Sequence, residues 1–86
     1  MKHILRDDIH PFLHEQIIGT VNSLELKREE AALLLEIEPR TFSYFKAGVT
    51  TCSAPTLLLY LTKMCPDPMQ FINEAKIIVE KAEANL

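Results

Sequence analysis

Residues 28–48 read REEAALLLEIEPRTFSYFKAG and predict two short helices, Arg28–Leu35 and Pro39–Ala47, joined by a tight turn. The two glutamates after Arg28 fall in the first turn of the earlier helix, where the helix dipole favours carboxylates. Pro39 suits the first position of the later helix, because that position has no intrahelical N–H bond to lose. Gly48 is the natural left-handed terminator. The run therefore sets two helices close together at a defined angle.

The spacing of apolar residues predicts how these two helices pack. Ala32 is small enough to let the two backbones approach, and Leu35 and Ile37 frame the turn. Phe42 and Phe45 lie three residues apart on one face of the later helix, so we expect both rings to pack on the earlier helix. The opposite face of the later helix is then free, and its outward residues are Pro39, Arg40, Ser43 and Tyr44.

This pair resembles the helix-turn-helix of the lambda-repressor-like (Cro and Xre type) DNA-binding family. The resemblance extends to Ser53–Leu61 and to Pro66-Asp67-Pro68, which look like the fourth helix and exit turn of its antitoxin or phage regulators. It covers about Leu13 to Pro68. The resemblance implies a compact, all-α, five-helix lambda-repressor-like domain with a central helix-turn-helix.

The resemblance also implies roles for individual residues. One group falls on base-reading positions: Arg40, Tyr44, Ser43 and Pro39. A second group falls on positions that contact the DNA phosphates: Lys27, Arg28, Lys46, Thr50 and Thr51. An arginine that grips guanine bidentately contributes about 1 to 3 kcal/mol of discrimination at one base pair. Tyr44 has a second interpretation, as a residue that contacts a partner protein.

Three departures from the family pattern affect these expectations. Glu36 stands where glycine is usual, which requires a left-handed non-glycine residue or another turn, at about 1 kcal/mol. Lys27 stands at a helix cap where Ser, Thr or Asn is usual, and the loop after Gly48 lacks Arg and Lys. Within 27–48 four basic residues balance four acidic ones. One copy should therefore bind DNA weakly, and a homodimer with helices about 34 Å apart would compensate.

The remaining segments also show helical spacing, so the whole chain is predicted to be all-α. We expect the first helix to start between Asp8 and Pro11, to end at Asn22–Ser23 and to bury the stripe Leu13, Ile17, Val21 and Leu24. Residues 1–7 would form an arm, a strand across a dimer or a frayed end.

Proline pairs and caps mark the last two helices. Ser53 with Pro55 opens a fourth helix, and its expected apolar face consists of Leu57, Leu58, Leu61 and Met64. Asp67 caps a fifth helix that starts at Pro68, with the expected stripe Ile72, Ala75, Val79, Ala82 and Leu86, widened by Phe71 and Ile78. Residues 68–86 are a candidate dimerisation element. Only one of the adjacent residues Leu33 and Leu34 can face the core, so the other should be exposed. The exposed leucine and the wide apolar face of the last helix suggest self-association or a partner protein. The alternative is that these residues fill the core of a monomer.

Length and composition limit the class of protein. The 86 residues suit a single domain, 1–86, and 48% hydrophobic residues are enough for a core. No apolar run reaches the roughly 18 residues of a membrane span, and charges interrupt the start, so we expect a cytoplasmic protein without membrane contact. Cys52 and Cys65 lack metal or disulfide spacing, and His10 and His14 lack a third ligand. We expect no metal, no cofactor and no enzyme activity.

Three functions from different classes remain open. The first is a sequence-specific transcriptional regulator, most simply a repressor, acting as a homodimer on a palindromic operator in double-stranded DNA. The second is a protein-interaction module, such as an antitoxin or a phage-encoded inhibitor, that binds a toxin or host protein and has lost strong DNA binding. The net charge of −3 favours this second class. The third is a small structural subunit that only dimerises.

Overall fold

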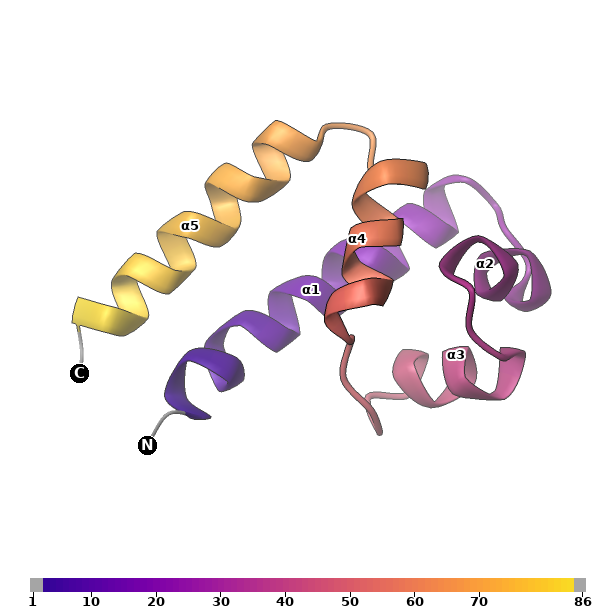
Figure 1. Ribbon diagram of the computed structural model, residues 1–86, viewed down its shortest axis with the longest axis horizontal. Coiled ribbons are helices and arrows are strands. Elements are labelled where there is room, and N and C mark those ends of the chain that lie inside the picture. The colour runs from indigo at the N-terminus through magenta and orange to yellow at the C-terminus, as the bar shows by residue number, and fades with distance from the viewer. Residues whose placement is uncertain (1–2, 85–86) are drawn as a thin grey trace.

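The computed structural model describes residues 3–84, and side chains from residue 9 onward. Five helices follow one another in this range: α1 His3–Ser23, α2 Arg28–Leu35, α3 Pro39–Lys46, α4 Ala54–Lys63 and α5 Pro68–Ala84 (Figure 1). Residues 3–84 contain no strand, which confirms the all-α prediction. None of these helices combines the length and the hydropathy that crossing a membrane requires.

The predicted start of the first helix is wrong. α1 begins at His3 and places Pro11 in its interior, not in its first turn. A proline inside a helix removes one backbone hydrogen bond, but the 21 residues of α1 retain many others, and packing on α5 supports the helix. Residues 3–7 continue α1 as helix, while Met1 and Lys2 lie outside the described residues.

The core lies where α1, α2, α3 and α4 meet. It buries the predicted residues Leu13, Ile17, Val21, Ala32, Leu35, Phe42, Phe45 and Met64. The centre of this core is a residue that the sequence did not single out. Tyr60 is 0% exposed, and its hydroxyl lies 2.8 Å from the Thr20 hydroxyl and donates to the Gln16 carbonyl at 3.3 Å. α4 is thereby tied to α1 by a satisfied polar group inside an apolar core.

Three residues assigned to buried stripes are exposed instead: Leu24 is 53% exposed, Leu58 63% and Ile72 48%. Leu24 follows the end of α1 at Ser23, so the helical spacing no longer applies to it. α4 and α5 carry apolar residues on more than one face, and each helix buries only one. In α4 the buried face contains Tyr60 and Met64, and in α5 it contains Phe71 and Ala82.

Three helices end in the same hydrogen-bonded turn, the Schellman motif. After α2 the Ile37 N–H donates to the Ala32 carbonyl and the Glu36 N–H donates to the Leu33 carbonyl. The same pair of bonds follows α1 and α3. The left-handed residue of each turn is Glu25 (φ 55°), Glu36 (φ 56°) or Gly48 (φ 82°). The sequence correctly identified the left-handed position at Glu36 as one solution of the turn, but it did not predict the one at Glu25.

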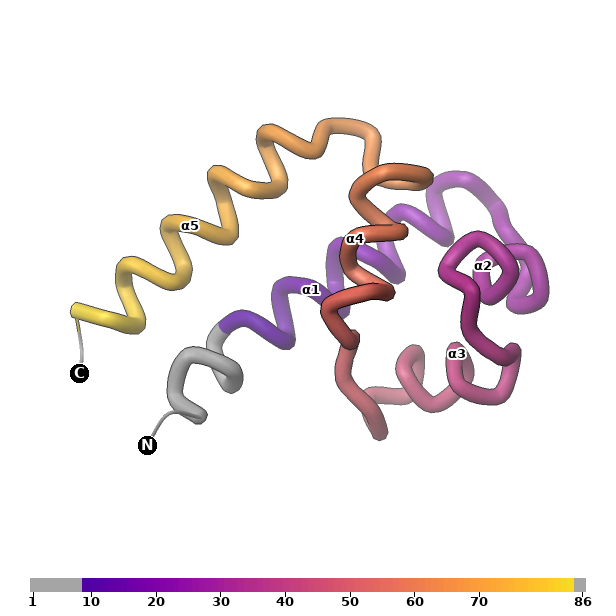
Figure 2. Tube along the Cα trace, viewed as in Figure 1, coloured from indigo at the N-terminus to yellow at the C-terminus, as the bar shows by residue number. Residues whose placement is uncertain are grey.

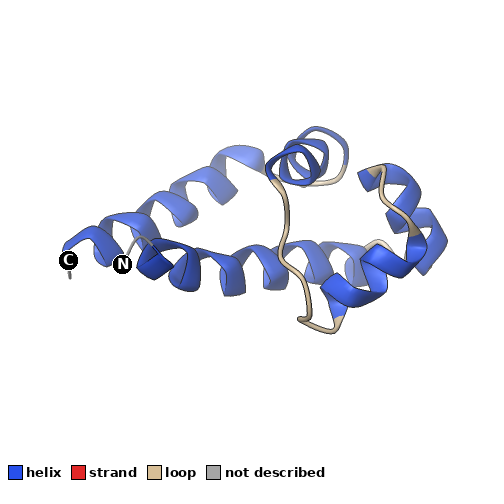
Figure 3. Ribbon diagram, turned by 60° about the horizontal axis from the view of Figure 1, so that its bottom comes forward, coloured by secondary structure: helices blue, strands red, loops and turns tan. Residues whose placement is uncertain are grey.

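α5 runs back along α1, and the two helices form one end of the molecule (Figure 3). The Phe12 and Phe71 rings lie 5.2 Å apart, and the Phe71 ring is 5.7 Å from that of Tyr60. α5, the candidate dimerisation element, buries Phe71 and Ala82 within the chain and leaves Ile72 and Ile77 exposed. Leu86 of that stripe lies outside the described residues. α2 and α3 lie at the opposite end of the molecule (Figure 2).

Candidate nucleic-acid interface

α3 is held on the core by its two phenylalanines, as predicted. Phe42 is 2% exposed and Phe45 is 7% exposed, with ring centroids 6.5 Å apart. A side chain from α1 holds the far end of α3, because the Nε2 of His14 lies 3.0 Å from the Lys46 carbonyl oxygen and donates to it. The His14 ring also packs on Phe45 at 5.1 Å. The core therefore fixes which face of α3 reaches solvent.

That outward face carries two of the predicted base-reading side chains. Arg40 is exposed, and Tyr44 is 47% exposed. Among the side chains of residues 9–84, Arg40 makes no hydrogen bond or ion pair. Glu36 lies four residues before Arg40 but pairs with Lys63 instead, at 3.3 Å. The guanidinium is thus available to a ligand.

The other two predicted base-reading residues are less available. Pro39 occupies the first turn of α3 and is partly buried. Ser43 is half-buried and accepts a hydrogen bond from the Nη1 of Arg28 at 3.3 Å. The Ser43 hydroxyl keeps its own hydrogen and a second lone pair for a ligand. Of the four predicted base-reading residues, Arg40 and Tyr44 are the two that are exposed.

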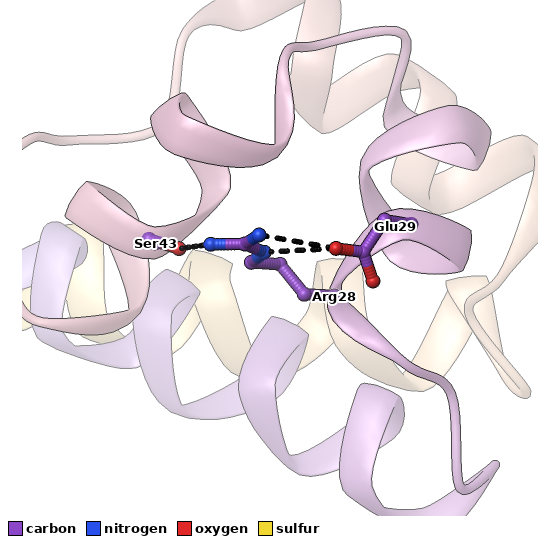
Figure 4. Close-up of polar contacts among 3 residues, drawn as sticks. All are labelled: Arg28, Glu29 and Ser43. Atoms are coloured by element: carbon purple, nitrogen blue, oxygen red, sulfur yellow. Dashed lines mark hydrogen bonds and ion pairs between the residues drawn. The ribbon is translucent and has the colours of Figure 1, made fainter.

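Arg28 connects the start of α2 to the middle of α3 (Figure 4). Its Nη2 and Nε also donate to the Glu29 carboxylate, at 3.1 and 3.3 Å. A backbone hydrogen bond at Glu29, followed by the hydrogen bond from Arg28, lowers the pKa of this carboxyl from its ordinary value of 4.5. Glu29 is therefore ionised near neutral pH and partly neutralises the arginine.

A cleft of about 270 Å³ brings together Arg28 and Lys46, two of the predicted phosphate-binding residues. Ser43 and Asn22 also line it, while Val21 and Phe42 form apolar parts of its wall. Two cationic side chains beside a hydroxyl and an amide suit an anion with several oxygen atoms, such as a phosphate group. Asn22 was not predicted, because a residue at the end of one helix gives no sequence signal that it faces two others.

The remaining predicted phosphate-binding residues lie apart from this cleft. Thr50 and Thr51 are exposed in the loop between α3 and α4, where they line a different groove with Gly48 and residues of α1. Lys27 precedes α2, and its backbone N–H donates to the Glu30 carboxylate at 2.8 Å. This bond is one half of a capping box, whereas the Lys27 side chain makes no cap hydrogen bond. Of the predicted phosphate-binding residues, the structure therefore brings only Arg28 and Lys46 together in this cleft.

Within residues 9–84 no three His, Cys, Asp or Glu side chains gather where a metal ion could bind. Cys52 and Cys65 are both free thiols, and burial raises the pKa of the Cys52 thiol above its ordinary value of 9.0.

Comparison of the chain with protein families, curated proteins and solved structures finds no match. α2, α3 and the side chains between them are therefore the features from which a function can be inferred.

Proposed function

We propose that the protein is a sequence-specific DNA-binding regulator whose α2 and α3 form a helix-turn-helix of the lambda-repressor-like type. One observation carries this proposal: α3 buries Phe42 and Phe45 and presents Arg40 and Tyr44 to solvent. A short helix with an unpaired arginine on its outer face can enter the major groove, where arginine reads guanine. The core behind α3 provides the rigid support that such reading requires.

In this proposal, phosphate binding and base reading use different parts of the α2–α3 pair. Arg28 and Lys46 in the cleft bind a backbone phosphate and orient the domain, while Arg40 and Tyr44 contact base edges. Binding to an operator blocks or recruits polymerase. Four basic residues balance four acidic ones within residues 27–48, so two copies on a palindromic site supply the affinity that one copy lacks.

The experiment is selection of a preferred duplex from a random pool, followed by anisotropy titrations with the wild type and two variants. Arg40→Ala should lose discrimination at one base pair by about 5- to 150-fold, while keeping affinity for random DNA. Arg28→Ala should weaken all sequences alike and reduce the dependence of affinity on salt. Lys76→Ala, on the exposed surface of α5, is the matched control. Unchanged binding by both α2–α3 variants would contradict the proposal.

A second function has an observation in its favour. Leu33 is 77% exposed on the outer face of α2, and glutamates lie next to it on the same helix. An exposed leucine among carboxylates suits a protein surface with an apolar pocket and basic rim better than it suits DNA. In this interpretation the chain is a protein-interaction module, such as an antitoxin or an inhibitor that binds a toxin or host protein.

The two functions differ in which substitution removes binding. Leu33→Lys should abolish capture of a protein partner and leave DNA binding intact or slightly stronger, because it adds a positive charge. Arg40→Ala should leave capture of the protein partner intact and reduce the preference for the selected duplex over random DNA. Retention of the wild type on random duplex DNA at low salt, compared with recovery of a stoichiometric protein partner, shows which activity is present.

A further inference from the structure

A second concave surface lies between α1 and the loop that joins α3 to α4, and it meets the charged cleft at Asn22. We call it the α1 groove; it has a volume of about 660 Å³ and includes Pro11, Ile18, Phe45, Thr50 and Thr51. Small-molecule sites typically measure about 300 to 1,000 Å³ and have mostly apolar walls with a few polar groups. The α1 groove fits this description in both size and lining.

Gly19 helps to form this groove, although neither helix propensity nor close packing requires a glycine at this position. Gly19 lies inside α1, where glycine disfavours the helix relative to alanine, and it lines the groove. No atom outside its own helical surroundings lies within 4 Å of the position that a Cβ would take, so close packing does not exclude a side chain. The missing side chain therefore provides open space at the cost of helix stability.

The polar groups of the α1 groove define the charge of its occupant. Glu15 is the only Asp, Glu, Lys or Arg side chain among the described residues that line it. Glu15 is exposed, so its carboxylate is open to a molecule that lies in the groove. A cationic group on such a molecule would be complementary to this carboxylate.

We infer that the α1 groove binds a small apolar molecule that carries a protonated amine. Its apolar body covers the wall formed by Pro11, Ile18 and Phe45 and fills the space above Gly19. The Glu15 carboxylate provides the charge complementary to the ammonium group. This site goes beyond DNA binding and does not depend on it, because none of Arg28, Arg40, Tyr44 and Lys46 lines the groove.

The test compares three probes that share one ring and differ in charge: 2-phenylethylamine, 2-phenylethanol and phenylacetate. Each is titrated into the ¹⁵N-labelled full chain, and amide shifts are followed by NMR. The amine should shift the amides of Gly19, Thr50 and Thr51 in a saturable way and bind more tightly than the neutral alcohol by about two- to fivefold. Phenylacetate should bind most weakly.

Two pairs of variants separate the groove from general effects. Gly19→Leu fills the groove and should remove the saturable shifts, while Asn73→Leu adds the same side chain on exposed α5 and should leave them unchanged. Glu15→Gln should abolish the preference for the amine over the alcohol, while Glu80→Gln, the same charge change on exposed α5, should retain it. Gly19→Ala adds only a methyl group and reports binding if the leucine variant does not fold.

Several results would overturn the inference. These are equal binding of phenylacetate and the amine, shifts that persist in Gly19→Leu, or an absence of shifts at the groove amides. Shifts of the same amides that grow with protein concentration alone would show that a second copy of the chain occupies the groove. That outcome would also exclude the small-molecule site.

Discussion

Replacing either left-handed glutamate with glycine should stabilise the fold, and the two sites should differ by a measurable amount. An L-residue with a side chain loses about 1 to 2 kcal/mol in the left-handed conformation that Glu25 and Glu36 adopt. Glycine removes this strain but also makes the unfolded chain more flexible, which costs about 0.4 to 1 kcal/mol. The net gain for Glu25→Gly is therefore about 0.5 to 1 kcal/mol.

Glu36→Gly should gain less than Glu25→Gly. Glu36 forms an ion pair with Lys63 at 3.3 Å, and glycine removes it. The paired side chains are 65% and 40% exposed, so water screens the pair and its loss costs only about 0 to 1 kcal/mol. Among the side chains of residues 9–84, Glu25 forms no ion pair. The strain relief at the two turns is otherwise the same.

Thermal unfolding followed by circular dichroism measures both effects. A domain of this size changes its Tm by about 4 to 8 °C per kcal/mol, so Glu25→Gly should raise the Tm by about 2 to 8 °C. Glu25→Ala is the control, since it removes the carboxylate but keeps the Cβ, and it should bring no comparable gain. If Glu25→Gly leaves the Tm unchanged or lowers it, the left-handed strain assigned to this turn is not present.

Three further predictions concern α4 and its contact with α1. Tyr60→Phe should reduce the free energy of unfolding by about 1 to 3 kcal/mol in urea titrations, because Thr20 and the Gln16 carbonyl lose their partner. Burial raises the pKa of Tyr60 above its ordinary value of 10.0, so folding favours the neutral phenol. The stability that the neutral phenol contributes is therefore complete below pH 10 and falls as the pH rises above 10. If the free energy of unfolding fell no more steeply above pH 10 in the wild type than in Tyr60→Phe, this prediction would be wrong. Ser53→Ala should destabilise the fold by about 0.5 to 2 kcal/mol, because the Thr56 N–H loses its acceptor; an unchanged urea midpoint would show that Ser53 is not a working cap.

The helices after α1 could be predicted from local signals in the chain. Pro39, Ser53 and Asp67 mark helix starts, and the structure contains helices that begin at or just after these residues. Side-chain oxygens of Ser53 and Asp67 accept the expected backbone N–H bonds. Proline geometry and capping act within a few residues, so neighbouring sequence is sufficient to locate them.

Pro11 shows where local signals fail. A proline near a polar residue is typical of a helix start, but α1 begins at His3, before Pro11, and as a whole it packs on α5. That contact joins residues far apart in sequence, and no local pattern reports it. The same limit applies to Glu25, because a left-handed glutamate has no characteristic neighbours.

The core of α4 was difficult to predict for a different reason. Leu57, Leu58, Leu59 and Leu61 surround Tyr60, so hydropathy allows several buried faces and favours a leucine one. The structure buries Tyr60 completely because Thr20 and Gln16 satisfy its hydroxyl. A polar group can occupy the centre of a core when a partner is present, and that partner lies 40 residues away in the chain.

The candidate site was predicted in its residue types but not in its arrangement. Spacing alone indicated that Arg40 and Tyr44 face away from the two phenylalanines, and the structure agrees. Sequence spacing gave no sign that Arg28 would reach Ser43 across 15 positions of the chain. A long side chain such as arginine can reach several partners, and the one it contacts depends on which groups lie near it in the folded structure.

The bond between Arg28 and Glu29 has a consequence for how the protein would respond to ionic strength. A DNA phosphate that reaches this guanidinium replaces a carboxylate that already neutralises it, so one anion is exchanged for another. The displaced carboxylate then attracts a cation from solution, which opposes the release of ions from the DNA. Arg28 would therefore contribute less than a full charge to the slope of log affinity against log salt. If the chain binds DNA as proposed, a count of its basic residues would overestimate that slope.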